Sequence, residues 1–514
     1  MHKTTFSITG DNLTVENSVQ IVITNRKISL SKSSEKKVKA SRKLVEKWIA
    51  NDEVIYGITT GFGEFKDVKI HGKDLHDLQR NLILSHAAGV GKYIPDFIVR
   101  LMLLFRINSL ASGYSGIRIE LLHHLIKIFN SGIVPLVPSQ GSVGSSGDLS
   151  PLSHLALTII GEGQCKCDGE ITDSNTALKK KKIKPIKLSA KEGLALINGT
   201  QMMSAYLCKS VYDAEYLSKA ADISGSMSLD AMRGSVKAFS DKLQKVRPHK
   251  GQTATANNLR KLLKGSEILD SHRNCGKVQD AYSLRCMPQV HGAVKDTINY
   301  CKSVLETEIN SVTDNPLIFT EGEEFIAGGN FHGEPLALEA DFLAIAVSEL
   351  GSISERRTAR LVDGSLSGLP RFLVDADKAG LNSGLMIVQY TAAALVSENK
   401  VLCHPASVDS IPTSANQEDH NSMGSVSSRK CFDVVNNVKK IIAIEIMCAA
   451  QGIDFLRPLK SGKGTEQAYL NLRKEIEHIS DDVITSGIIL KTVETVFNEN
   501  FLVSVESKSG KLES

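Results

Sequence analysis

Residues 338–360 read LEADFLAIAVSELGSISERRTAR, and apolar side chains recur along this segment at intervals of three and four. The positions that share one face are Leu338, Phe342, Ile345, Ala346, Leu350 and Ile353. This spacing is typical of a long amphipathic helix. We therefore expect a helix here whose apolar face packs against other helices.

Two further segments show the same periodicity. One stripe consists of Cys431, Val435, Val438, Ile442 and Ile446, and we expect another over residues 289–309. Several long helices predict a bundle, with functional motifs in the connections at helix ends. Residues 6–8 and 20–24 favour short strands instead, so the amino-terminal region is expected to be small and mixed.

The composition excludes several classes of protein. The 514 residues carry 61 basic and 57 acidic side chains, a balance that does not favour nucleic acid or a membrane as a partner. The sequence shows no signal peptide and no membrane span. Nine cysteines, an odd number without repeated spacing, indicate reduced thiols, and we expect a cytoplasmic protein.

Residues 141–152, GSVGSSGDLSPL, carry the most specific chemical signal. Gly147 has no Cβ to hinder its amide nitrogen, which can approach the carbonyl of Ser145, and Ser146 can then lose water. The product is a methylidene-imidazolone ring, in which the side chain of Ser145 is a bystander. The alternative is an ordinary Gly/Ser turn before a helix, with Asp148 as the N-cap.

Other blocks decide between these interpretations. They are YGITTGFG (56–63), LQRNLILSHAAGVG (78–91), EGLALINGTQ (192–201), VQDAYSLRCMPQVHGA (278–293), GGNFHGEP (328–335) and TSANQEDH (413–420). In this order they resemble the aromatic amino acid lyase family from about residue 56 to about residue 423. The cyclising motif of that family usually reads Ala-Ser-Gly, so this chain departs from it at Ser145.

The resemblance implies a fold and an assembly. The fold is mainly α, with a long central helical bundle of the aspartase/fumarase-like type and a smaller, mixed amino-terminal region that carries the cyclised loop. We expect an amino-terminal domain over residues 1–200, the bundle and carboxy-terminal helices over 201–503, and a frayed tail over 504–514. The family further implies a homotetramer in which active sites take residues from more than one chain.

The resemblance also implies a reaction, the elimination of ammonia from an α-amino acid. The amine leaves badly and the β-hydrogen is hardly acidic, so an electrophile is needed that no ordinary side chain supplies. A 4-methylidene-imidazol-5-one group formed from Ser145, Ser146 and Gly147 would supply it, with no external cofactor and no metal. Tyr56, in its glycine-rich segment, matches the family's general base.

Matching positions suggest how substrate is held. Arg285 offers a forked guanidinium to the substrate carboxylate, and Gln279 and Tyr282 lie in the same block. Asn198 can add a hydrogen bond to the carboxylate or the ring. Phe331 is expected to pack beside the prosthetic ring.

Two residues indicate which amino acid is used. His86, after Ser85, can hydrogen-bond an imidazole, and Glu418 matches the carboxylate of histidine-specific members. A buried carboxylate would be left unpaired by a benzene ring. The sequence therefore predicts conversion of L-histidine to urocanate; the alternatives are a lyase or 2,3-aminomutase acting on tyrosine or phenylalanine, or a non-catalytic helical scaffold.

Overall fold

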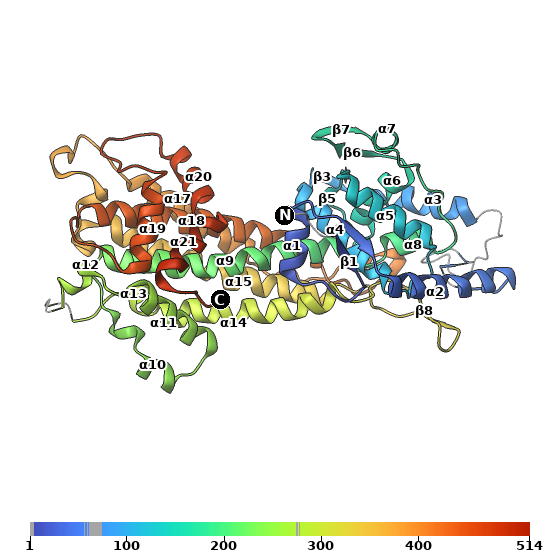
Figure 1. The fold of residues 1–514 in the computed structure, drawn as a ribbon, viewed down its shortest axis with the longest axis horizontal. Coiled ribbons are helices and arrows are strands. Elements are labelled where there is room, and N and C mark those ends of the chain that lie inside the picture. Colours follow the sequence, from blue (N-terminus) through green and yellow to red (C-terminus); the bar gives the residue numbers. More distant parts are fainter. Residues whose placement is uncertain (1–4, 56, 59, 61–74, 274–275, 277) are drawn as a thin grey trace. The chain divides into compact units, whose positions relative to one another are not determined.

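The computed structural model describes residues 5–55, 57–58, 60, 75–273, 276 and 278–514, and it is mainly helical, as predicted (Figure 1). The chain forms two compact units. Unit 1 comprises Met1–Tyr212, Cys301–Asp341 and Pro405–Arg429, and unit 2 comprises Asp213–Tyr300, Phe342–His404 and Lys430–Ser514.

Four long helices dominate the secondary structure. They are α9 (Gln201–Ala231), α14 (Met287–Glu308), α15 (Glu334–Val362) and α18 (Gly424–Asp454). The apolar periodicity of residues 338–360, 289–309 and 431–446 thus predicted three of them. Helices α15 and α18 extend beyond their stripes at both ends, whereas α14 begins two residues earlier and ends one residue before the predicted limit.

The face predicted for α15 needs a correction. Of the predicted face, Leu350 and Ile353 are buried, but Leu338, Phe342 and Ile345 are 37%, 44% and 44% exposed, and Leu343 and Val347 are fully buried in their place. The helix carries apolar residues on more than one side, so periodicity alone could not tell which side meets the core. The exposed stripe remains an unpartnered apolar surface in this single chain.

The amino terminus also differs from the prediction. The short strand β1 (Phe6–Ile8) is present and pairs in parallel with β2 (Ile28–Leu30). Residues 20–24, expected as a strand, instead lie in or directly after helix α1 (Val15–Ile23). Thr14 and Asn17 form a capping box at the start of α1, which favours the helix over the β-branched run that suggested a strand.

The shorter α-helices and the strands of unit 1 lie before residue 200, except for two strands between residues 317 and 326. The helices are α2 (Lys32–Ala50), α3 (Leu75–His86), α4 (Asp96–Ala111), α5 (Ile119–Ser131), α6 (Leu149–Ile160), α7 (Ser174–Lys180) and α8 (Glu192–Ile197). The strands are β3 (Val90–Tyr93), β4 (Val134–Pro135), β5 (Pro138–Gln140), β6 (Gln164–Cys167), β7 (Glu170–Asp173), β8 (Leu317–Phe319) and β9 (Glu324–Ile326). Helices α3, α6 and α8 pack against one another (Figure 1). Predicted site residues lie in or directly beside all three: His86 in α3, Gly147 before α6 and Asn198 after α8.

Unit 2 contains the remaining helices. They are α10 (Asp241–Val246), α11 (Lys250–Leu262), α12 (Glu267–Asp270), α13 (Tyr282–Arg285), α16 (Gly364–Ser367), α17 (Met386–Leu402), α19 (Lys463–Arg473), α20 (Thr485–Val496) and α21 (Glu499–Ser509). Residues 504–514, predicted as a frayed tail, are helical as far as Ser509. Burial of Val505 and Leu512 and a hydrogen bond from the Glu513 amide to Asn258 hold this end in place.

Candidate active site

The predicted cyclising segment forms a tight turn that leads into α6. Gly144 and Gly147 both have a φ of +71°, a left-handed conformation that side chains rarely adopt. A Cβ atom at Gly147 would lie 2.2 Å from the carbonyl oxygen of Gly199, and the Asp148 amide donates to the same oxygen at 2.7 Å. This approach of two backbones requires glycine at position 147.

The carbonyl of Ser146 and the N–H of Gly147 belong to the same peptide group, but only the carbonyl makes a hydrogen bond among the described residues. Asn198 Nδ2 donates to the Ser146 carbonyl oxygen at 3.2 Å, whereas the Gly147 N–H has no acceptor within the described part of the chain. Arg106 is buried and donates to the carbonyl of Asn198 at 2.8 Å, which fixes the backbone that carries this asparagine. The Gly147 nitrogen, which cyclisation would use, is thus the one whose N–H makes no hydrogen bond in the described part of the chain.

Asp148 connects the turn to two helix starts. It precedes α6, as the turn interpretation expected, but its side chain does not cap that helix. Its Oδ2 instead accepts from the Met202 and Met203 amides of α9 at 2.9 and 3.0 Å, and its Oδ1 accepts from Ser425 Oγ of α18 at 2.7 Å. Burial raises the pKa of Asp148 to about 6, although these hydrogen bonds act in the opposite direction.

Glu418 faces the two serines of the turn. Its Oε1 accepts from Ser146 Oγ at 2.9 Å, and its Oε2 accepts from Ser145 Oγ at 2.9 Å and from Thr413 Oγ1 at 2.8 Å. Thr413 and Glu418 also form a backbone bridge around Ser414, Ala415 and Asn416, which all have positive φ. This tight loop presents the carboxylate to the turn.

A cavity of about 410 Å³ adjoins this contact. Its lining includes Ser145, Ser146, Phe331, His332, Glu418 and His420. The cavity therefore brings together four of the predicted site residues, Phe331 among them.

The sequence profile described as aromatic amino acid lyase matches residues 13–474. This chain belongs to the aromatic amino acid lyase family.

Individual members of the family are similar over nearly the whole chain. The histidine ammonia-lyase of Caldanaerobacter subterraneus subsp. tengcongensis is 51% identical over 475 residues, which cover 92% of this chain and 93% of that protein. The crystal structure of histidine ammonia-lyase from Trypanosoma cruzi superposes with a TM-score of 0.92 at 42% identity, covering 98% of this chain and 96% of that one. Tyrosine aminomutase from Streptomyces globisporus superposes equally well, with a TM-score of 0.93 at 36% identity and coverage of 99% and 100%. The fold of an aromatic amino acid lyase therefore does not by itself identify the substrate.

His86 ends α3 in a defined orientation. Its Nδ1 lies 2.9 Å from the Leu82 carbonyl oxygen, and because a carbonyl only accepts, Nδ1 carries the proton. The Nε2 of the neutral ring therefore keeps its lone pair. Burial lowers the pKa of His86, an effect that the hydrogen bond to Leu82 and the charge of Glu418 partly offset.

The remaining predicted residues are not brought to this cavity by described contacts. Tyr56 lies outside the described residues. Gln279, Tyr282 and Arg285 belong to unit 2, where the Arg285 guanidinium lies over the Tyr282 ring at 4.7 Å and Tyr282 is 70% exposed. Their roles in catalysis and carboxylate binding stay predictions.

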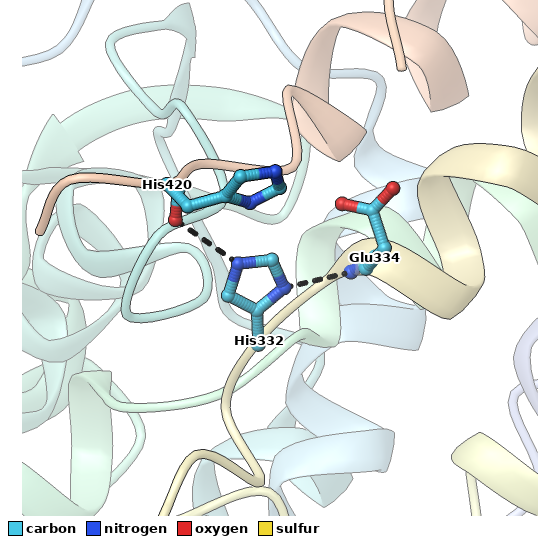
Figure 2. Close-up of side chains that lie close together, drawn as sticks. All are labelled: His332, Glu334 and His420. Carbon is cyan, nitrogen blue, oxygen red and sulfur yellow. Dashed lines mark hydrogen bonds between the residues drawn. The ribbon is translucent and has the colours of Figure 1, made fainter. Parts of the chain in front are cut away.

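His332, Glu334 and His420 form the one group of three possible metal ligands among the described residues. Figure 2 shows how His332 is held: its Nε2 donates to the His420 carbonyl oxygen at 3.1 Å, and its Nδ1 accepts from the Glu334 amide at 3.3 Å. Both ring nitrogens are thus engaged, and neither offers a free lone pair to a cation. We interpret His332 as a bridge between the start of α15 and the loop that carries Glu418.

Sequence reasoning missed several residues that shape the site. Thr413 lies five residues before Glu418 and His332 directly follows Phe331, inside the blocks that carry the resemblance, yet no local pattern reveals their partners. Ser425, which contacts Asp148, lies beyond the last block. The hydroxyl of Ser145, expected to be a bystander, contacts Glu418.

The described residues include no helix that is long and apolar enough to cross a membrane.

Proposed function

We propose that this aromatic amino acid lyase is a carbon–nitrogen lyase that eliminates ammonia from L-histidine and releases urocanate. The observation that carries this proposal is the Glu418 carboxylate, which contacts Ser146 at 2.9 Å beside a cavity. An imidazole N–H can donate to this carboxylate, whereas a phenyl ring would leave the charge without a partner. Relatives about half identical to this chain carry the name histidine ammonia-lyase, which agrees with this choice.

The turn fits the 4-methylidene-imidazol-5-one group that the family resemblance implies. Gly147 is required by its contact with Gly199, and its N–H has no acceptor in the described part of the chain. Asn198 would hold the group at the former Ser146 carbonyl. When formed, the group supplies an electrophile that makes the substrate amine a better leaving group, with no external cofactor.

The side chains of the cavity can position the imidazole. Glu418 accepts the one N–H of a neutral imidazole. The lone pair on Nε2 of His86 is an alternative acceptor for that N–H. The Oδ1 of Asn198 is buried and has no hydrogen-bond partner among the described residues, so it is an unused acceptor beside the turn. Phe331 lines the same cavity and restricts its volume.

Further roles fall to predicted residues that have no described contact with the cavity. Tyr56 would take the β-proton, and Arg285 would bind the substrate carboxylate through two parallel hydrogen bonds. Gln279 and Tyr282 would complete the polar surroundings of the substrate.

A homotetramer with shared active sites, located in the cytoplasm, completes the proposal. In unit 2, Tyr300 of α14 and Phe342 and Ile345 of α15 line an exposed apolar groove. Contiguous apolar surface of this kind is typical of protein interfaces. Multi-angle light scattering of the purified protein tests this part, and a monomer that is fully active would contradict shared sites.

The enzymatic proposal is tested with purified protein and no added cofactor. L-Histidine should yield urocanate, detected by its ultraviolet absorbance, and intact-mass analysis should show the loss of two waters. L-Tyrosine and L-phenylalanine serve as comparison substrates, and their products are identified as acrylates or β-amino acids. Full turnover of either one with none on L-histidine would favour the alternative lyase or aminomutase.

A further inference from the structure

The hydrogen bonds of Glu418 are unevenly divided between its two oxygens. A carboxylate oxygen offers about two lone-pair sites. Oε2 has two donors, Ser145 Oγ and Thr413 Oγ1, at 2.9 and 2.8 Å. Oε1 has one donor, Ser146 Oγ, at 2.9 Å. Oε2 is therefore saturated, and the acceptor capacity that faces the turn is on Oε1.

Cyclisation of the turn would remove one of these donors and keep the others. The Gly147 nitrogen bonds to the Ser145 carbonyl carbon, whose oxygen leaves as water with the protons of the Gly147 and Ser146 nitrogens. Ser146 then loses its Oγ as a second water together with its Cα proton, which creates the Cα–Cβ double bond. Neither water contains the Oγ of Ser145, so that hydroxyl remains attached to the ring.

We propose that cyclisation itself frees Glu418 Oε1 to bind the substrate imidazole, and that the retained hydroxyl of Ser145 is a positioning group that holds Oε2. Loss of the Ser146 hydroxyl leaves Oε1 without a donor, and the imidazole N–H takes its place. Ser145 and Thr413 keep Oε2 saturated, so the carboxylate cannot rotate without breaking two hydrogen bonds. This inference rests on the proposed function and deepens it.

Ser145 therefore contributes to the selection of histidine over a phenyl substrate. An ionised acceptor that lacks its donor favours a ligand with an N–H group and disfavours one without it. The residue at which this chain departs from the usual Ala-Ser-Gly motif thus acquires a physical role. It acts through Glu418 and takes no part in bond making.

The first experiment compares the wild-type protein with Ser145→Ala. Intact mass should show two waters lost from both. Isothermal titration calorimetry with urocanate should show an affinity about fivefold weaker for the variant, because the lost hydrogen bond affects the ligand only through the position of the carboxylate, while cinnamate binds both proteins equally. The KM for L-histidine should rise by a similar factor with little change in kcat. Ser145→Thr, which keeps a hydroxyl, should restore the wild-type values.

Thr413 provides a matched second donor. Thr413→Val should weaken urocanate binding as Ser145→Ala does, and Thr413→Ser should not. If Ser145→Ala changes the affinities for urocanate and cinnamate by the same factor, or changes neither, the positioning role of Ser145 is wrong.

The second experiment uses Ser146→Ala, which has neither the hydroxyl nor the ring. Because Oε1 lacks a donor in this protein, it should prefer urocanate over cinnamate as strongly as the mature wild type does, and adding Glu418→Gln should abolish the preference. No preference in Ser146→Ala would overturn the role assigned to the departing hydroxyl. These experiments measure the ratio of the affinities for urocanate and cinnamate. The proposed function is tested separately, and it fails if cyclised wild-type protein yields no urocanate from L-histidine.

Discussion

Two carboxylates contact the cyclising turn, and their surroundings differ in kind. Asp148 is fully buried, and its partners include two backbone amides at the start of α9. Glu418 is partly exposed at a cavity, and its partners are three hydroxyl groups. Backbone amides cannot be exchanged without moving a helix, whereas a hydroxyl can be replaced by another donor. Asp148 therefore holds the turn in place, whereas the Glu418 carboxylate can exchange a hydroxyl donor for a donor on the substrate.

The largest effect is expected from Ser146→Ala. This substitution removes a hydroxyl that contacts Glu418 and leaves the partners of Asp148 unchanged. The variant should fold with an unchanged melting temperature but should release neither of the two waters, and its activity should fall by about four orders of magnitude or more, because no other side chain supplies the electrophile. Intact mass and urocanate formation measure the two effects.

Ser150→Ala provides the matched control for that variant. The Ser150 hydroxyl is buried near the same turn and has no hydrogen bond in the described part of the chain. This control should keep both the mass loss and the activity. Unchanged turnover in Ser146→Ala would mean that Ser146 does not form the electrophile.

A smaller loss of activity is expected from Glu418→Gln, which tests whether this carboxylate binds the imidazole of the substrate. The amide keeps the shape but not the charge, so kcat/KM for L-histidine should fall about a hundredfold, as for the loss of a charged hydrogen bond. Any residual rate with L-phenylalanine should be unaffected. Asp409→Asn, which changes an exposed carboxylate that does not line the cavity, is the control and should behave as wild type. An equal fall with both substrates would mean that Glu418 supports the turn and does not select the substrate.

The fold was largely predictable because long helices leave a strong periodic signal. Apolar spacing located α14, α15 and α18, but it could not choose between the two apolar sides of α15. At α1 the β-branched residues after position 20 favour a strand, but the capping interaction of Thr14 and Asn17 starts a helix that continues through them.

The site was predictable only where chemistry depends on adjacent residues. Ser146 and Gly147 can be assigned locally because cyclisation joins neighbours. His86 and Glu418 needed the family resemblance, since no periodicity links residues that are more than 300 positions apart in the chain. The contact between Asp148 and Ser425, 277 positions apart, is set by how the helices pack. Reasoning from the sequence alone has no access to such partners.

Titration of Asp148 provides the smallest and most specific test of its fixing role. Its folded pKa of about 6 lies above its ordinary value of 3.8, so the folded chain binds more protons than the unfolded chain between these values. The contribution of Asp148 to the free energy of unfolding therefore falls as pH rises, by about 2 kcal/mol between pH 4 and pH 6. Buried Asp230 also has a pKa of about 6, so the measurement compares denaturant unfolding of wild type with Asp148→Asn at each pH, which cancels the other groups. The stability of wild type relative to the variant should decline across this window. A difference that is independent of pH would mean that Asp148 is already ionised at pH 4 and that its hydrogen bonds outweigh its burial.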